Sequence, residues 1–170
     1  MSASAFMTFV HLVADGDVDN VARRLAGAPE LATKAAGEGA TRQSSAPYFF
    51  ENIAHCLYAG DTALHVAAAA LQPKIAALLI SRGADCRARN RRGAEPLHYA
   101  ADANHWNPDA QAETITFLIS AGADPRLPNG RGSTPMQLAQ RTTGRGGSGS
   151  PQAEIVKLLA EHGAGRRRNG

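Results

Sequence analysis

Apolar and polar positions alternate along the chain in blocks that recur at a nearly constant spacing. A polar turn that begins at Gly60 leads into a stretch of small apolar residues, and similar turns begin at Gly93, 33 residues later, and at Gly132, 39 residues after that. Behind each turn, Ile and Leu recur three and four residues apart, as on one face of an α-helix. The pattern predicts three helix pairs, at residues 60–90, 91–129 and 130–164.

The N-terminal part of the chain departs from this spacing. Residues 6–26 form a weaker copy of the pattern, in which Val18, Val21 and Leu25 recur at helical spacing. We interpret this copy as a degenerate end repeat, which needs one polar face because no further repeat covers it. Residues 27–47 are rich in Gly, Ala, Ser and Thr and predict an irregular connection.

An apolar segment at residues 48–58 follows this connection. Phe49, Ile53 and Leu57 are four residues apart, which places them on one face of a helix. The segment therefore predicts an extra helix. We expect this helix to cover the open flank of the first repeat, because a helix this apolar is usually buried. The alternative is an exposed aromatic contact surface.

Three phrases recur in the same order in the repeats. They are variants of Gly-x-Thr-Pro-Leu-His-x-Ala-Ala, of an Ile-x-x-Leu-Leu helix and of Gly-Ala-Asp. This order resembles the ankyrin repeat, closely over residues 60–164 and loosely over 8–26, with extended links between helices. The resemblance implies an all-α ankyrin-repeat solenoid, in which stacked helix-turn-helix repeats carry short β-hairpin or turn fingers. It also implies a concave side lined by the first helix of each repeat and by the fingers.

The copies differ from the ankyrin phrase and from one another. Ala63 replaces the usual Pro, and Glu95 replaces the usual Thr. The link between the two helices is longer in the later repeats, with insertions near residues 102–112 and 141–152. Because both insertions fall at the same point of adjacent repeats, we expect them to lie side by side on one edge of the stack.

Composition narrows the function classes. The chain of 170 residues has a net charge of +3, and fifteen of its eighteen basic residues are Arg, which suits two-point contacts with carboxylates or phosphates. No run of about 18 apolar residues occurs, so we expect no membrane span. Cys56 and Cys86 are too few for a disulfide framework and fit a reducing cytoplasm. We expect one cytoplasmic domain at residues 1–165, followed by a disordered basic tail at 166–170.

Candidate catalytic and ligand-binding groups are few. His65 and His98 occupy a turn position of the resembled repeat, which implies a structural role for both. The sequence contains no nucleophile elbow and no Cys and His set with zinc spacing. We therefore predict that the chain is not an enzyme and takes no cofactor and no metal. The Gly-rich loop at 144–151 precedes a predicted helix start and offers an alternative, an anion- or nucleotide-sensing module, although it lacks the Gly-Lys-Ser/Thr ending of a nucleotide loop.

The resemblance implies a non-catalytic protein–protein interaction scaffold. We expect a monomer that binds a protein partner, and the Arg-rich fingers favour an acidic one. Nucleic-acid binding through the basic edge is a further alternative, as is an edge that is merely solvated. The single Trp either contacts the partner or covers the neighbouring helices. The residues predicted to contact the partner are Arg87, Arg89, Arg91, Arg92, Asp102, His105, Trp106, Arg131, Arg141 and Arg145.

Overall fold

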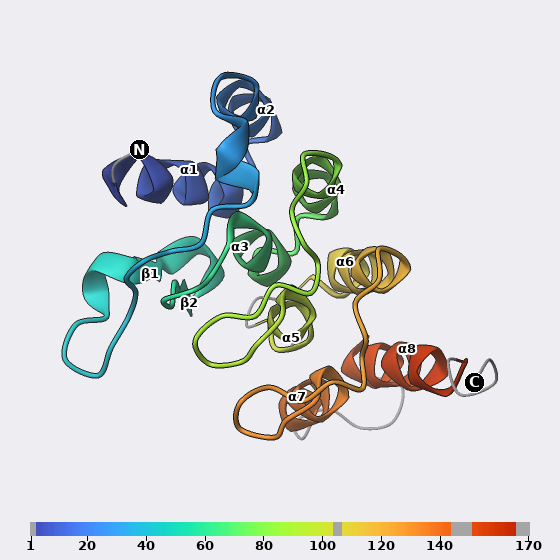
Figure 1. The fold of residues 1–170 in the computed structure, drawn as a ribbon. Coiled ribbons are helices and arrows are strands. Elements are labelled where there is room, and N and C mark those ends of the chain that lie inside the picture. The colour runs from blue at the N-terminus through green and yellow to red at the C-terminus, as the bar shows by residue number, and fades with distance from the viewer. Residues whose placement is uncertain (1–2, 104–106, 144–150, 166–170) are drawn as a thin grey trace.

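Four helix pairs stacked side by side make up the fold (Figure 1). The computed structural model describes residues 3–103, 107–143 and 151–165. The pairs are α1 (Ala3–Asp15) with α2 (Val18–Gly27), α3 (Ala63–Ala69) with α4 (Pro73–Ser81), α5 (Pro96–Ala101) with α6 (Pro108–Ser120), and α7 (Pro135–Thr143) with α8 (Pro151–Gly165). Helices α1, α3, α5 and α7 contact one another in order as an inner layer, and α2, α4, α6 and α8 do so as an outer layer. The predicted all-α solenoid is confirmed.

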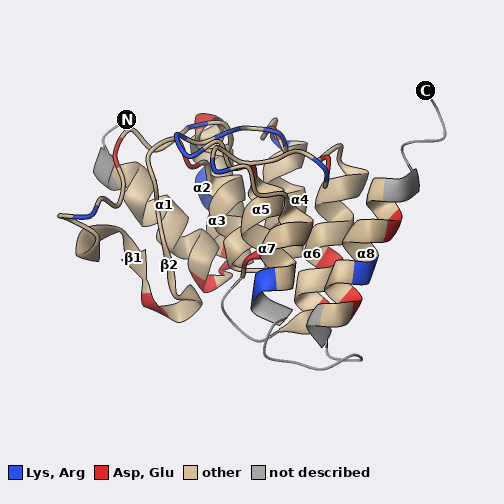
Figure 2. Ribbon diagram, turned by 90° about the horizontal axis from the view of Figure 1, so that it is seen from below, with Lys and Arg blue, Asp and Glu red and all other residues tan. Residues whose placement is uncertain are grey.

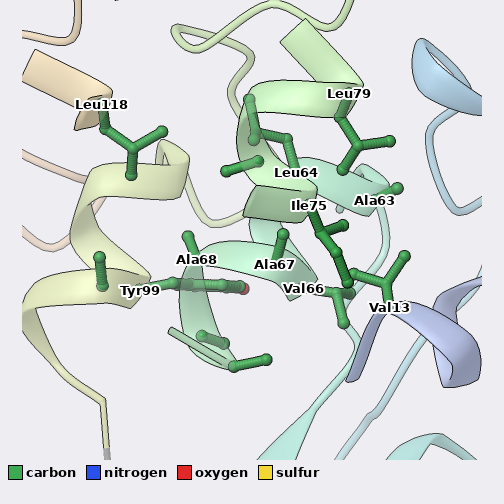
Figure 3. Close-up of a cluster of buried hydrophobic side chains, with 14 of the residues drawn as sticks. Val13, Ala63, Leu64, Val66, Ala67, Ala68, Ile75, Leu79, Tyr99 and Leu118 are labelled. Atoms are coloured by element: carbon green, nitrogen blue, oxygen red, sulfur yellow. The ribbon is translucent and has the colours of Figure 1, made fainter. Parts of the chain in front are cut away.

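Small side chains allow the layers to pack closely. Every residue of α3 is buried, and four of its seven residues are Ala. The helix lies between α1 and α5, with α4 against its outer side. Val13 of α1, Leu79 of α4 and Tyr99 of α5 surround it (Figure 3). Since apolar burial is the main favourable term in folding, α3 depends on both of its neighbours in the stack.

A histidine closes the turn before each of two inner helices. At the start of α3, His65 Nδ1 accepts a hydrogen bond from the Thr62 backbone N–H at 3.1 Å, and its Nε2 lies 3.0 Å from the carbonyl oxygen of Ala94 in the next turn. Before α5, His98 Nδ1 accepts from the Glu95 backbone N–H at 3.1 Å. These contacts give both histidines a structural role, and His65 also ties one repeat to the next.

The extra helix predicted at residues 48–58 is wrong. This part of the chain contains the 3₁₀ turns η2 (Ala46–Tyr48) and η3 (Glu51–Ile53) and the antiparallel strands β1 (Phe49–Phe50) and β2 (His55–Cys56). Ala54 has a left-handed φ of 48°, which turns the chain back between the strands. The four-residue spacing of apolar side chains suited a helix, but β1 and β2 pair with each other, and the Leu57 carbonyl accepts a hydrogen bond from the Ala40 N–H.

Residues 33–61 form a single long link, which we call the extended finger. The other fingers are the links from one outer helix to the next inner helix, at residues 82–95 (second finger) and 121–134 (third finger). At the base of the extended finger, Ala36 donates its N–H to the carbonyl of Asp61 and accepts from the N–H of Gly60, both at 2.7 Å. The two edges approach so closely at Gly39 that a Cβ there would lie 2.4 Å from a backbone nitrogen of the opposite edge.

The extended finger packs apolar side chains against the first repeat. Phe50, Ile53 and Leu57 belong to the continuous buried core, and the His11 ring of α1 contacts the Phe50 ring at a centroid distance of 4.8 Å. Phe49, which the helical spacing placed on the buried face, is instead 43% exposed. The finger therefore packs against α1 through Phe50 of β1, a residue that the helical spacing did not place on the buried face.

The links between paired helices are only partly described. Helix α6 already begins at Pro108, where Asn107 Oδ1 caps it by accepting the Ala110 N–H at 3.2 Å. Part of the insertion predicted at 102–112 is therefore an extension of α6. Residues 144–150, which make up nearly all of the predicted Gly-rich loop, and the tail 166–170 lie outside the described residues.

Ala54 provides a test of the turn in the extended finger. It is exposed and left-handed, with φ 48° and ψ 44°, a conformation that costs a residue with a Cβ about 1 kcal/mol relative to Gly. We expect Ala54→Gly to raise the free energy of unfolding by about 0.5–1 kcal/mol in urea titrations. Ala160, exposed in α8, is the control, because Ala160→Gly should lower the same quantity by about 1 kcal/mol. Destabilisation by both substitutions would contradict the assigned turn.

Candidate functional site

A trough runs along the side of the molecule formed by the fingers and the inner helices. It consists of two hollows that meet at Cys56, Tyr58, Arg92 and Arg131. The larger hollow, of about 720 Å³, lies between the extended finger and the tips of the second and third fingers. The smaller hollow, of about 330 Å³, lies between β2, α5, the third finger and α7. In Figure 2 the finger loops run together along one side of the helices, and blue segments mark their basic residues.

Arg side chains dominate the charge of this trough, which we call the basic trough. Among the described residues that line it, Glu38 and Asp102 are the only carboxylates, so five positive and two negative charges leave a net charge of +3. Neither salt bridge of the described residues involves a lining Arg. The five residues are Arg42, Arg91, Arg92, Arg131 and Arg141.

Two of these guanidinium groups are held in place by neighbouring side chains. Arg92 Cζ lies 4.2 Å from the centroid of the Tyr58 ring, a cation–π contact between the second finger and the extended finger. Arg141 Nη2 donates a hydrogen bond to Ser133 Oγ at 3.0 Å. A side chain that is already ordered loses less conformational entropy when it binds a ligand, so both groups are prepared for contact with an anion.

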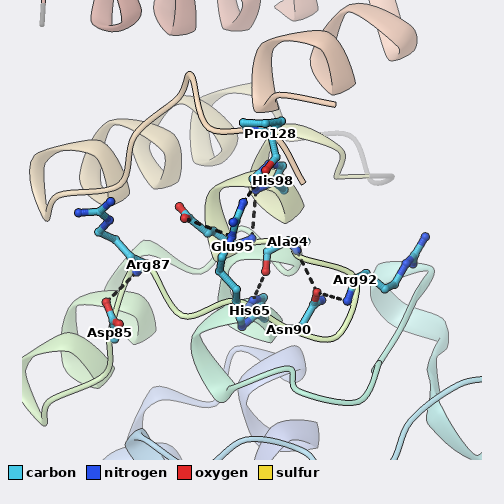
Figure 4. Close-up of polar contacts among 10 residues, drawn as sticks. His65, Asp85, Arg87, Asn90, Arg92, Ala94, Glu95, His98 and Pro128 are labelled. Atoms are coloured by element: carbon cyan, nitrogen blue, oxygen red, sulfur yellow. Dashed lines mark hydrogen bonds and ion pairs between the residues drawn. The ribbon is translucent and has the colours of Figure 1, made fainter. Parts of the chain in front are cut away.

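Other Arg side chains of the second finger lie away from the trough. Arg87 and Arg92 point to opposite sides of this finger (Figure 4). Arg89 Nε lies 3.8 Å from Glu95 Oε1, and the Arg89 guanidinium also donates to a carbonyl oxygen of the third finger. The Arg-rich surface predicted from the sequence is therefore divided in two, and Arg87 and Arg89 do not line the trough.

The structure brings together half of the residues predicted to contact a partner. Those that line the trough are Arg91, Arg92, Asp102, Arg131 and Arg141. Those that lie outside the described residues are His105, Trp106 and Arg145.

Sequence reasoning missed the contribution of the extended finger. Arg42 and Glu38 belong to a segment that was interpreted as an irregular connection, and Tyr58 was assigned to a helix. Pairing between the two edges of the extended finger brings these three residues beside the second finger. The only sequence signal for this contribution was that Arg42 lies within a run rich in Gly and Ser. Its place in the trough depends on the pairing of the two edges of the finger, which the sequence does not show.

A buried polar network lies beneath the trough. The carboxylate of Asp61, which is fully buried, accepts hydrogen bonds from the Tyr58 backbone N–H at 2.7 Å, from Asn90 Nδ2 at 2.8 Å and from the Tyr99 hydroxyl at 3.0 Å. Burial raises the pKa of Asp61, and the nearby His65 and these donors oppose the rise. The network joins the extended finger, the second finger and α5, and so fixes the positions of the residues above it.

Two histidines border the smaller hollow as neutral imidazoles at pH 7. Burial lowers the pKa of His55 to about 4, with a further contribution from the Arg92 charge. Burial also lowers the pKa of His98 to about 4, against the effect of hydrogen bonds with the backbone. Burial raises the pKa of Cys56, next to His55, which is the opposite of what a reactive thiol needs. Among the described residues, no three His, Cys, Asp or Glu side chains are grouped to hold a metal ion.

Comparison with known families decides what the repeats are. A family described as ankyrin repeats, in three copies, matches residues 7–124, which include most of α1 and all of α2 to α6. This chain belongs to the ankyrin-repeat family. Ankyrin repeats are protein–protein interaction modules, and the family is typically non-enzymatic. No match was found among the curated proteins. No helix in the described ranges is both long and apolar enough to span a bilayer.

The fourth helix pair continues the ankyrin stack beyond the matched residues. Helix α7 contacts α5, and α8 contacts α6, as in the earlier repeats. Gln137 takes the place of the ankyrin histidine, and its Oε1 accepts the Thr134 backbone N–H at 2.9 Å. An amide oxygen thus makes the capping contact that an imidazole nitrogen makes in the two preceding turns.

Glu95 occupies the position where the ankyrin turn has Thr. The residue is 2% exposed, its Oε1 lies 3.8 Å from Arg89 Nε, and its Oε2 has no hydrogen-bond partner within the described part of the chain. Burial raises the pKa of Glu95, and the Arg89 charge opposes the rise. A buried carboxylate with one unpaired oxygen costs stability when it is ionised.

Replacement of Glu95 tests this cost. A pKa raised in the folded state means that the group's contribution to stability is lost as the pH rises from about 4.5 through the folded value. We expect Glu95→Thr to raise the free energy of unfolding by about 1–2 kcal/mol at pH 8 and by less at pH 4, as measured by urea titration. Glu95→Gln removes the charge but keeps the size and should show the same pH trend. A gain that is equal at both pH values would exclude the carboxylate charge as its cause.

Proposed function

We propose that this ankyrin-repeat chain binds an acidic segment of a protein partner in the basic trough. The observation that carries the proposal is the convergence of five Arg residues from three fingers and α7 on one surface, with a net charge of +3. The sequence separates these residues by as many as 99 positions, from Arg42 to Arg141. Because these residues are spread along one side of the stack, they favour an extended acidic ligand over a small ligand that contacts a single Arg.

The chemistry of the trough supports an acidic protein segment. Opposite charge attracts a ligand before contact and raises its association rate, and Arg forms two-point hydrogen bonds with carboxylates. The exposed ring of Phe49 and the partly buried rings of Tyr48 and Tyr58 line the same trough. A ligand that combines acidic and apolar side chains therefore matches the surface best.

The trough acts as a preformed binding surface in this proposal. The Asp61 network and the contact between Arg92 and Tyr58 hold its walls in position before a ligand arrives. Its histidines are neutral at pH 7 and its cysteine has a raised pKa, so these groups favour a binding role over nucleophilic chemistry. In the proposed mechanism, a rigid trough presents its Arg side chains to the partner without a change of conformation.

A charge reversal tests the proposal. The double variant Arg91→Glu and Arg92→Glu should lose its acidic partners in affinity capture followed by mass spectrometry, and should bind a Glu-rich peptide at least about tenfold more slowly at low salt. The control is Arg23→Glu with Arg24→Glu, an adjacent exposed pair on α2 with the same change in charge. A partner set that the trough variant leaves unchanged, or that both variants change alike, would overturn the proposal.

The same capture experiment distinguishes a nucleic-acid ligand. Nuclease treatment before capture leaves protein partners in place if the trough binds them directly. Loss of all captured material after this treatment would assign the basic trough to nucleic acid, whose phosphate contacts weaken steeply with salt.

A further inference from the structure

The smaller hollow of the basic trough concentrates charge in a confined space. Arg92, Arg131 and Arg141 line its volume of about 330 Å³, and Asp102 is the only carboxylate that the described part of the chain contributes to it. Its histidines, His55 and His98, are uncharged at pH 7. The lining therefore carries three positive charges and one negative charge, a net charge of +2 at a single point of the trough.

The donors of this hollow are positioned and largely unused. The Arg92 guanidinium lies 4.2 Å from the centroid of the Tyr58 ring, and Arg141 uses one N–H group in its hydrogen bond to Ser133 Oγ. A guanidinium group carries five N–H donors, so most donors of these groups remain for a ligand. The Arg131 side chain forms no ion pair with any described residue.

His55 adds a neutral polar group to the same wall. Its Nε2 is buried without a hydrogen-bond partner among the described residues, while its ring packs edge-on against the Tyr99 ring at a centroid distance of 4.5 Å. Because this nitrogen is covered by protein atoms, the imidazole lines the hollow without adding a charge to it.

We propose that the smaller hollow is a subsite for a phosphoryl group carried by a side chain of the bound protein segment. The inference rests on the proposed function and specifies which chemical group of the bound segment occupies the smaller hollow. A phosphorylated side chain carries a charge of about −1.5 to −2 and three acceptor oxygens, which matches a net lining charge of +2. A carboxylate carries one charge and is satisfied by a single Arg, so it leaves most of these donors unused.

Small probes test the subsite without knowledge of the partner. Phenyl phosphate, benzoate and inorganic phosphate are titrated separately into the full chain at one ionic strength, and binding is followed by NMR of the Arg side-chain N–H groups. Phenyl phosphate should bind at least about tenfold more tightly than benzoate, because each additional charged hydrogen bond strengthens binding by about that factor. Equal binding of phenyl phosphate and benzoate overturns the proposal.

Matched variants locate the binding. Arg131→Gln and Arg141→Gln should each weaken binding of phenyl phosphate about tenfold. Arg126→Gln is the control, since Arg126 is paired with Asp124 and does not line the trough. Urea titration checks that each variant keeps its fold, and Arg131→Lys with Arg141→Lys retains the charge if a Gln variant unfolds. Binding that is insensitive to Arg131 and Arg141, or equally sensitive to Arg126, overturns the subsite.

The remaining outcomes separate this inference from the proposed function. Inorganic phosphate that binds as tightly as phenyl phosphate would assign the hollow to free phosphate and overturn the assignment to a side chain. A Glu-rich peptide that depends on Arg91 and Arg92, without preference for phenyl phosphate, overturns the subsite and leaves the acidic-partner proposal standing. Selective binding of phenyl phosphate without any acidic protein partner overturns the wider trough as a protein-binding surface and, with it, the assignment of the phosphoryl group to a protein side chain.

Discussion

The turn at Gly60 is tied to the turn at Gly93 by buried polar contacts. His65 Nε2 meets the Ala94 carbonyl oxygen at 3.0 Å, and the buried carboxylate of Asp61 accepts from Asn90 and Tyr99 of the following repeat. A buried group that loses its partner costs about 1–3 kcal/mol, so one finger cannot slide along the next without a large loss of stability. This constraint aligns the finger tips, and the alignment gathers their Arg side chains on one surface.

The extended finger serves both the core and the surface. One side of it places Phe50 and Leu57 in the buried core, where the Phe50 ring contacts His11 of α1. Its other side brings Tyr58 beneath the Arg92 guanidinium and Arg42 to the edge of the larger hollow. The same insertion therefore packs against α1 and forms a wall of the trough, which links the stability of the finger to the geometry of the candidate site.

Local patterns predicted some elements and misled at others. The turns at Gly60, Gly93 and Gly132 were readable because three copies of one phrase support the same interpretation. Residues 48–58 were not, since apolar residues four apart suit a helix, whereas this segment folds into a short antiparallel hairpin and pairs with the opposite edge of the same finger through Ala40. Arg87 and Arg92 looked equivalent in the sequence, but the turn between them directs their side chains to opposite sides (Figure 4).

The sequence by itself determined the stack of helix pairs, the small inner helices and the structural histidines. The sequence phrases that signal these features each span only a few positions, and their recurrence in several repeats makes them recognisable. Only the tertiary structure decided which Arg residues share a surface and that Tyr58 supports one of them. The reason is that Arg42, Arg92, Arg131 and Arg141 lie far apart along the chain and meet only when the fingers are stacked in register.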